Sequence, residues 1–430
     1  MTRADAAADR TDPETRTAPS GSAGPAVRVL DGDGVRVAHG LFGSAIHMGG
    51  PVDDERWART APSYTPGRTF GVDDPAPVGE ARLAGSATSF ASALTVPGGA
   101  RIPMAAVTRV GVRADRTRRG LLSALMTAQL RDSAARGEIA ASLRATETAI
   151  YGRFGYGVAT RGRDLRVPSR TPFRAGPSEG GDVRMVTGDE ARTVLPEVYA
   201  RAQARIPVPG VIERDEVWWG LSLDHPGRPA PAVAVHRSPT GPDDGYVVWT
   251  VTHEGPGFAD NVLEVQDLQA TTPAVLAALW RFVLGIDLVR EVKARLRPID
   301  DPLELFLTDP RAARTTGIVD ETWLRLLDVP AALAARAWGD ADPVRIRVHD
   351  RLLPGNEGVH VIGGSDAGTA AEGEADLECD VAALAMAYLG DRRPSELVAS
   401  GWWSAHDPAA VTRADVLFAT PTTPWSGTFF

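Results

Sequence analysis

The chain has 430 residues, of which 43% are hydrophobic and 23% charged, and its formal net charge is −9. This length and composition predict a globular protein of two or three domains. The negative charge argues against a nucleic-acid partner, and the sequence lacks the run of about 18 apolar residues that a membrane-spanning helix needs. The single cysteine, Cys379, can form no intrachain disulfide, and the eight histidines do not fall at metal-ligand spacing. We therefore expect a cytoplasmic protein without a metal cofactor.

The first 26 residues are polar and small, and they lack the apolar segment of a secretory signal. We expect a disordered leader over residues 1–26 and a periodic, folded pattern from Val27 onward. Carboxylates in the first turn favour a helix over Asp53–Arg59. Apolar runs predict strands over Ser86–Pro97 and Ile102–Val112, with the turn sequence PGG between them.

A basic loop, RADRTRRG, comes after these strands and leads into an amphipathic helix. Leu122, Leu125, Met126 and Leu130 recur on one face of that helix at a spacing of about 3.6 residues. A short strand is expected over Ile139–Thr146, and the stretch IYGRFGYGVAT then reads as a short helix that turns into a strand. This order predicts a mixed α/β layer.

A linker-like stretch, RTPFRAGPSEGGD over residues 170–182, separates this segment from a second one. There we expect strands at residues 183–186, 246–253 and 261–270 and helices over Glu190–Arg205 and Ala278–Ile286, and the stretch VKARLRP, residues 292–298, ends the segment. A third segment, from Thr316, is expected to hold strands at 322–329, 344–350 and 358–364 and a helix at 380–389. The predicted domains are therefore residues 27–170, 171–315 and 316–430.

The strongest chemical signal is the run VGVRADRTRRGLL, Val110 to Leu122, where a strand, a basic loop and a helix follow one another. The first N–H groups of a helix have no internal partner and carry a positive partial charge. With Arg116, Arg118 and Arg119 beside them and no side chain at Gly120, they can bind a pyrophosphate. The alternative is a solvated arginine cluster at a surface turn.

This run resembles the acyl-CoA loop R/Q-x-x-G-x-G/A of the GNAT (Gcn5-related) N-acetyltransferases, except that Leu122 stands where Gly or Ala is usual. A helix and a strand follow it, and then Tyr151-Gly-Arg-Phe-Gly-Tyr156, which is similar to the Y-x-x-x-G-F/Y block that closes GNAT domains. The resemblance implies that the strands flanking the loop splay apart and that acetyl-CoA adds between them like a further strand.

The resemblance also implies roles for single residues. Tyr151 would protonate the leaving thiolate as a general acid, a backbone N–H near Val110 would hold the oxyanion, and Tyr156 would pack in the core. The residues expected to bind acetyl-CoA are Val110, Gly111, Val112, Arg118, Arg119, Gly120, Leu121, Leu122, Ser123, Thr146 and Glu147.

Four blocks in order, VGVRADRTRRGLL, IYGRFGYG with its trailing AT, LTDPRAARTTG and VPAALAAR, resemble the Eis (enhanced intracellular survival) family of acetyltransferases. This resemblance implies an α+β fold with tandem GNAT domains, the second degenerate, followed by a sterol-carrier-protein-like domain, and a homohexamer. It also implies that the α-carboxylate of Phe430 is the general base, held by the Phe430 ring. Without the resemblance, a frayed or core-docked tail would be the preferred interpretation.

The sequence departs from that family where the acceptor would bind. The penultimate residue is Phe429, the segment Phe42–Ile46 lacks a carboxylate, and Arg109 stands where an apolar residue is expected. Trp57 matches a cleft tryptophan, and a core role is equally consistent with it. These departures predict weak attraction for a polycationic acceptor.

We therefore expect an acetyl-CoA-dependent N-acetyltransferase that acts on a primary amine of a small molecule, an aminoglycoside-like compound or a lysine. The alternative is a non-catalytic acyl-CoA or lipid-binding protein, in which the third domain would bind an apolar ligand. For an enzyme, the third domain is expected to be a scaffold that delivers Phe430.

Overall fold

The computed structural model describes residues 24–48, 52–78, 81–176, 180–224, 229–255 and 260–430. The leader expected over residues 1–26 therefore falls mostly outside the described residues. Twelve strands of the described chain form one mixed sheet, and four further strands form a second sheet. No helix among the described residues is both long and apolar enough to cross a membrane.

The first part of the large sheet is built by the elements that precede residue 170. In chain order they are β1 (Arg28–Val29), α1 (Gly32–Ala45), α2 (Asp54–Thr60), β2 (Thr69–Val78), β3 (Ala81–Thr95), β4 (Arg101–Val112), α3 (Leu121–Ala135), β5 (Ala140–Leu143), α4 (Thr148–Tyr151) and β6 (Gly157–Pro168). The expected helix after Asp53 is confirmed as α2, where the Asp53 side chain accepts a hydrogen bond from the Arg56 amide. Helix α1 had no clear periodic signal and was not expected.

The second part of the sheet is built by the elements between residues 182 and 326. They are β7 (Asp182–Met185), α5 (Gly188–Arg205), α6 (Glu216–Leu223), β8 (Ala232–Arg237), β9 (Gly245–His253), β10 (Asn261–Ala270), α7 (Pro273–Leu284), β11 (Val289–Pro298), α8 (Leu303–Phe306) and β12 (Arg314–Leu326). Helix α6 and strand β8 were not expected. Strands β7, β9 and β10 and helix α5 lie within two residues of their expected positions, whereas α7 begins five residues earlier than expected and β12 begins eight residues before the expected strand at 322–329.

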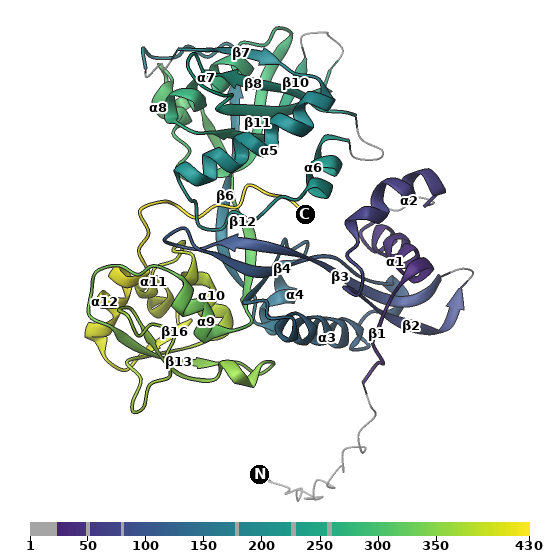
Figure 1. Cartoon of the computed structure of the whole chain (residues 1–430), viewed down its shortest axis with the longest axis vertical. Coiled ribbons are helices and arrows are strands. Elements are labelled where there is room, and N and C mark those ends of the chain that lie inside the picture. The colour runs from purple at the N-terminus through teal and green to yellow at the C-terminus, as the bar shows by residue number, and fades with distance from the viewer. Residues whose placement is uncertain (1–23, 49–51, 79–80, 177–179, 225–228, 256–259) are drawn as a thin grey trace, which may run out of the picture.

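The strand order joins these two parts into one continuous sheet, β1-β2-β3-β4-β5-β12-β6-β11-β10-β9-β8-β7. Strand β6, the last of the first expected domain, pairs with β11 and β12, whereas β12 pairs with β5 and β6. Each half thus places its last strand against the other half, and the view in Figure 1 shows β6 and β12 at the centre. The expectation that the strand at 322–329 opens the third domain is therefore wrong: it belongs to the large sheet, because β5 leaves that edge free for it.

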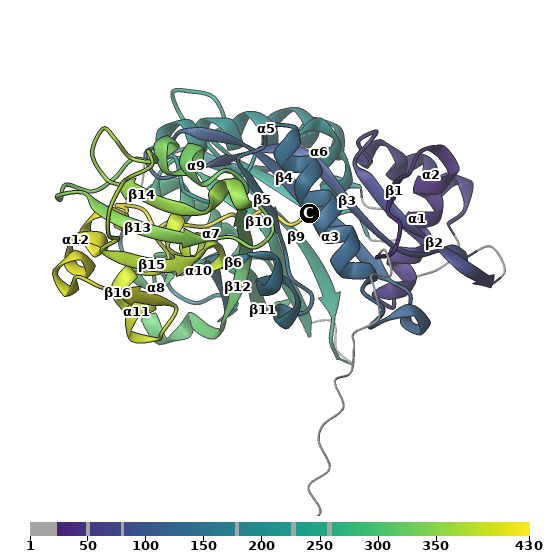
Figure 2. The same cartoon turned by 90° about the horizontal axis from the view of Figure 1, so that it is seen from below.

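The third part of the chain folds on the four-stranded sheet β14-β13-β15-β16. Its elements are α9 (Val329–Ala335), β13 (Val344–His349), β14 (Gly358–Ile362), β15 (Leu377–Asp380), α10 (Val381–Tyr388), α11 (Pro394–Ala399), β16 (Trp403–Ala405) and α12 (Pro408–Phe418). One apolar core runs from this part into β3, β4 and β12, and it joins Leu94, Met104 and Leu324 to Ile346 of β13 and Leu384 of α10. Figure 2 shows the third part, in green and yellow, beside the large sheet, and the shared core makes the two pack as one unit.

Candidate active site

Strands β4 and β5 pair in parallel over only three residue pairs, and the last of these is Ala106 with Ser142. Beyond it, β4 continues along β3 to Val112, while β5 ends one residue later, at Leu143. The two strands therefore separate where the sequence predicted that they splay. The separated edges carry backbone groups that an extended ligand can use as an added strand does.

A bulge lies in β4 at the point of separation. Thr108 pairs with Thr88 and Gly111 with Ser86, so that Arg109 and Val110 stand opposite Ala87 alone. Arg109 has a φ of 51°, which is unusual for a residue with a side chain. The bulge turns the backbone at Val110, and near this residue we expect a backbone N–H group to hold the oxyanion.

Helix α3 begins directly after the basic loop. Its N-cap residue is Gly120, with a φ of 77°, and its first turn holds no acidic side chain. Arg118, Arg119 and Gly120 are exposed, and neither arginine has an ion-pair or hydrogen-bond partner among the described residues. The helix N-terminus and these two guanidinium groups thus present positive charge to solvent, as pyrophosphate binding requires.

Arg116 differs from Arg118 and Arg119 because it forms ion pairs within the described part of the chain. Its guanidinium donates to the Asp74 carboxylate at 3.0 Å and to the Asp115 carboxylate at 2.7 Å. Burial alone would raise the pKa of Asp74. Hydrogen bonds from the Ala76 amide and from Arg116 outweigh burial and hold this pKa below its usual value. Strand β2 thus engages Arg116 at the base of the loop, and its expected part in pyrophosphate binding stays a prediction.

Gly111 has a packing reason that the sequence did not reveal. A side-chain carbon at this position would come within 3.1 Å of the Ala45 side chain and 3.4 Å of the Phe42 backbone, both on α1. The glycine therefore lets α1 lie close against the end of β4. Its expected contact with acetyl-CoA stays a prediction.

Tyr151, at the end of α4, is 6% exposed and belongs to a hydrophobic cluster with Val110 and Leu122 packed against it. Burial, with a smaller effect of Glu147, raises the pKa of Tyr151 to about 12. Its hydroxyl makes no hydrogen bond to a described residue. Thr146 and Glu147, on the stretch between β5 and α4, are exposed.

Tyr156 packs edge to face against the Tyr151 ring, with 6.0 Å between the ring centroids. Its hydroxyl is fully enclosed and has no hydrogen-bond partner among the described atoms, and burial raises the pKa of Tyr156 well above its usual value. A hydroxyl without access to a substrate has no catalytic use. The packing role expected for Tyr156 agrees with this environment.

The chain's last residues approach β3. The Phe430 ring meets the Phe90 ring edge to face at a centroid distance of 5.7 Å, while the Phe429 side chain is 70% exposed. Figure 1 shows the C-terminus beside α6, between the two parts of the large sheet. The ring anchor that the sequence predicted for Phe430 is therefore present.

An aromatic group lies beside Arg109, and of its members the sequence had singled out only Trp57. His39, Trp57 and Tyr64 are in mutual ring contact at 5.7–5.9 Å, and the His39 ring is hydrogen-bonded to the Tyr64 hydroxyl at 2.9 Å. The Arg109 guanidinium lies 4.5 Å from the Tyr64 ring centre and donates to the Ser63 hydroxyl at 2.8 Å. Burial raises the pKa of Tyr64 to about 12, although Arg109 opposes the shift. Aromatic residues on separate elements gave no signal in the sequence that they would meet.

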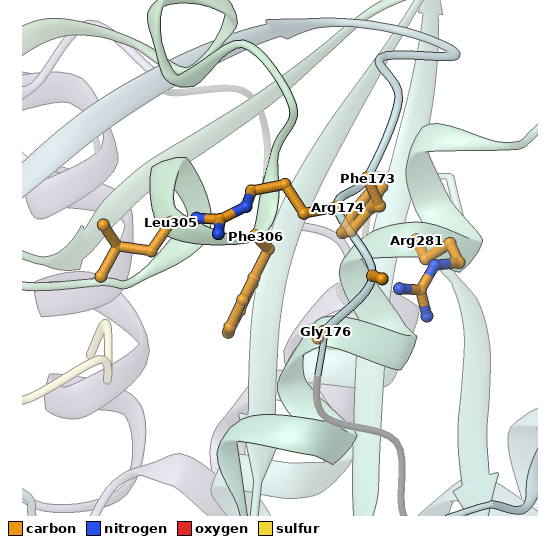
Figure 3. Close-up of a pocket in the computed structure, with 8 residues that line it drawn as sticks. Phe173, Arg174, Gly176, Arg281, Leu305 and Phe306 are labelled. Atoms are coloured by element: carbon orange, nitrogen blue, oxygen red, sulfur yellow. The ribbon is translucent and has the colours of Figure 1, made fainter.

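Two cavities lie away from these residues. The first, of about 180 Å³, is in the second part, and Figure 3 shows that Phe173, Arg174, Arg281 of α7 and Phe306 of α8 line it. A second, of about 410 Å³, lies in the third part around Trp338. No group of acidic, histidine or cysteine side chains that could hold a metal ion occurs among the described residues.

Comparison with known proteins decides the family. Residues 27–159 and 210–326 each match an "Acetyltransferase (GNAT) domain", and residues 329–427 match a "Sterol carrier protein domain". The chain is 33% identical over 379 residues to the N-acetyltransferase Eis of Mycobacterium tuberculosis, which covers 86% of this chain and 90% of that protein. The chain belongs to the Eis family of GNAT acetyltransferases.

A second relative and a solved structure agree with this assignment. An uncharacterized N-acetyltransferase of Streptomyces avermitilis is 36% identical over 396 residues, covering 88% of this chain and 93% of the relative. The crystal structure of Eis1 from Mycobacterium abscessus superposes with a TM-score of 0.81 at 38% identity, over 94% of this chain and all of that one. The expected tandem GNAT domains with a sterol-carrier-protein-like domain are confirmed. The chain is an acetyl-CoA-dependent acyltransferase, and the alternative of a purely binding protein has no support.

Proposed function

We propose that this Eis-family enzyme transfers the acetyl group of acetyl-CoA to a primary amine, with Tyr151 as general acid and the Phe430 carboxylate as general base. The observation that carries the proposal is the joining of three features in one place. Tyr151 packs in one cluster with Val110 and Leu122, which belong to the separated strand and to the helix after the exposed arginine loop. A thioester placed between the strands would thus lie near the Tyr151 hydroxyl.

The described residues fit acetyl-CoA. The backbone of Val110, Gly111 and Val112 would bind the pantetheine on one side, and Thr146 and Glu147 would line the other. The exposed Arg118 and Arg119, together with Gly120, Leu121, Leu122 and Ser123 at the start of α3, would bind the pyrophosphate. Support comes from the unpaired guanidinium groups and from the absence of acidic side chains in the first turn.

In the proposed reaction the amine nitrogen attacks the thioester carbonyl and forms a tetrahedral oxyanion, which accepts a hydrogen bond from a backbone N–H near Val110. The Phe430 carboxylate takes the proton that the nitrogen loses. The carbon–sulfur bond then breaks, and the thiolate takes a proton from the Tyr151 hydroxyl. A tyrosine with a pKa of about 12 is fully protonated at neutral pH, as a general acid must be.

The acceptor is proposed to be a monoamine, or an amine on an apolar or aromatic body. Support comes from the Arg109 guanidinium over Tyr64 and from the aromatic group around Trp57, because a cation beside an aromatic wall repels a polycation and favours an apolar body. Increasing salt should leave the KM of the preferred acceptor nearly unchanged, since little long-range attraction would be screened. A tetracationic aminoglycoside that proved the best acceptor would contradict this preference.

Release of CoA, measured at fixed acetyl-CoA with a panel of amines, tests the transfer itself. The base is tested by adding one glycine after Phe430, which moves the carboxylate by up to about 3.5 Å and leaves an amide in its place. A general base works within hydrogen-bond reach, so most activity should be lost while the melting temperature stays the same. Near-normal activity of the extended enzyme would show that the tail is only docked.

Two further properties are proposed, the first from the family resemblance and the second from the single cysteine. We expect a homohexamer, which multi-angle light scattering of the purified enzyme tests by its molar mass. We also expect a cytoplasmic location, which fractionation of the producing cells tests. For the third part of the chain we propose a scaffold role rather than lipid binding.

A further inference from the structure

The last residues, Trp425–Phe430, form an extended tail without helix or strand, yet several of them are buried. Ser426 and Thr428 are 1% and 0% exposed, and the Trp425 ring donates a hydrogen bond to the Leu296 carbonyl at 2.6 Å. Figure 1 shows this yellow segment leaving the third part of the chain and crossing the middle of the large sheet. Buried backbone without regular structure needs partners, and here side chains from other elements supply them.

Glu321, on β12, binds two consecutive amides of the tail. Its two carboxylate oxygens accept hydrogen bonds from the Ser426 N–H at 2.9 Å and from the Gly427 N–H at 2.8 Å. The Glu321 side chain is fully buried and is also paired with the Arg144 guanidinium at 3.1 Å. The Thr160 hydroxyl donates to it at 2.9 Å. A buried carboxylate is thus satisfied by the tail and by one cation.

The carbonyl groups of the tail are bound in turn by two arginines and a tryptophan. Arg144, just beyond β5, donates twice to the Thr428 carbonyl, at 2.7 and 3.0 Å. Arg214, just before α6, donates to the Gly427 carbonyl at 2.8 Å and to the Thr428 hydroxyl at 3.0 Å. The ring N–H of Trp218, on α6, donates to the Phe429 carbonyl at 2.8 Å.

These partners come from both halves of the large sheet, and each charge among them is compensated. Arg214 is paired with Asp267 at 2.5 Å. Burial alone would lower the pKa of Arg214, but the Asp267 carboxylate outweighs burial and raises this pKa. Every hydrogen bond to the tail from these residues ends on its backbone or on the Thr428 hydroxyl. These hydrogen bonds therefore set the position and direction of the chain's end, in addition to the contact of the Phe430 ring with Phe90.

We propose that Glu321, Arg144, Arg214 and Trp218 are positioning residues that hold the tail so that the Phe430 carboxylate lies at the acceptor amine. This inference rests on the proposed role of that carboxylate as general base. The four residues act through the tail and touch no reacting atom. Their loss should therefore lower kcat, while the KM for acetyl-CoA, which binds elsewhere, should remain unchanged.

The test uses Glu321→Gln in the full-length enzyme, whose intact mass first establishes that Phe430 is the last residue. The amide replaces one of two charge-assisted acceptors, each of which contributes roughly ten-fold or more to holding the tail. Carboxypeptidase A, which removes aromatic C-terminal residues, should release phenylalanine about 10-fold faster or more from the variant. The kcat should fall by a similar factor. Glu138→Gln, which breaks the buried pair with Arg68, is the matched control and should alter neither quantity.

A third measurement separates positioning from a general structural role. In the glycine-extended enzyme, which has no carboxylate at the Phe430 position, Glu321→Gln should cause no further loss of kcat. Unchanged release of phenylalanine, an unchanged kcat, or an additive loss in the extended background would each overturn the inference. Full activity of the glycine-extended enzyme would instead refute the role of the Phe430 carboxylate as general base. The rates of phenylalanine release would then still measure how tightly the tail is bound. If the Glu321→Gln enzyme does not fold, the same three measurements are made on Trp218→Phe. This substitution removes one hydrogen-bond donor and keeps an aromatic ring, so the expected changes are smaller.

Discussion

Replacing both exposed loop arginines, Arg118→Ala with Arg119→Ala, should weaken acetyl-CoA binding without harming the fold. Neither guanidinium has a partner among the described residues, so their removal leaves no buried charge uncompensated. A charge-assisted hydrogen bond to phosphate changes affinity by roughly ten- to a hundred-fold when it is desolvated. Because both side chains are exposed, we reduce this to about three- to ten-fold each, or roughly 10–100-fold together.

The assay is steady-state CoA release over a range of acetyl-CoA concentrations at saturating acceptor. The KM for acetyl-CoA should rise by this factor while kcat changes little, since binding of the pyrophosphate is uniform between ground and transition states. Increased salt should raise the KM of the unaltered enzyme more than that of the variant. Arg131→Ala, which replaces another exposed arginine further along α3, is the control and should change neither value. An unchanged acetyl-CoA dependence in the double variant would refute the pyrophosphate assignment.

Tyr151→Phe should lower kcat by about 10²-fold at constant melting temperature, whereas Tyr156→Phe, which removes an enclosed hydroxyl without a partner, should have a small effect. Since the pKa of Tyr151 is about 12, its acid form is complete below that pH and is lost only as pH rises through it, so kcat should show no Tyr151-dependent fall up to about pH 10. A fall below about pH 9 that vanishes in Tyr151→Phe would contradict this. Asp350→Asn leaves the fully buried Arg325 charge unpaired and should reduce the free energy of unfolding by about 3–5 kcal/mol in thermal or urea unfolding. Glu396→Gln, in an exposed pair, should cost less than about 1 kcal/mol by the same measurement.

Local chemistry was readable from the sequence. The basic loop that ends in Gly120, the apolar face of α3 and the position of Tyr151 at a helix end all follow from one short part of the chain. Helix caps, turn glycines and side-chain periodicity act over a few residues, so they leave their signal in a short window of sequence. The mixed α/β class and the likeness to GNAT acetyltransferases rest on such windows taken in order.

Contacts between distant residues were not readable in the same way. Arg116 was expected beside the ligand, and no short sequence pattern indicated that Asp74 of β2 pairs with it. The aromatic group of His39, Trp57 and Tyr64 forms only because α1, α2 and the following turn meet. A side chain's partner depends on where the backbone brings a second element, and propensity holds no information on that position.

The sequence by itself determined the residue types at the loop, at the tyrosine and at the end of the chain, because these are chemical identities that folding does not alter. Only the tertiary structure decided where the last strand of each half lies, since β6 and β12 have patterns that suit either half of the sheet. It also decided what the tail contacts. Glu321 and Ser426 are 105 residues apart, and their hydrogen bond exists because β12 crosses into the first half and meets the returning chain. Pairing over such separations depends on the whole fold and is not encoded in any short segment.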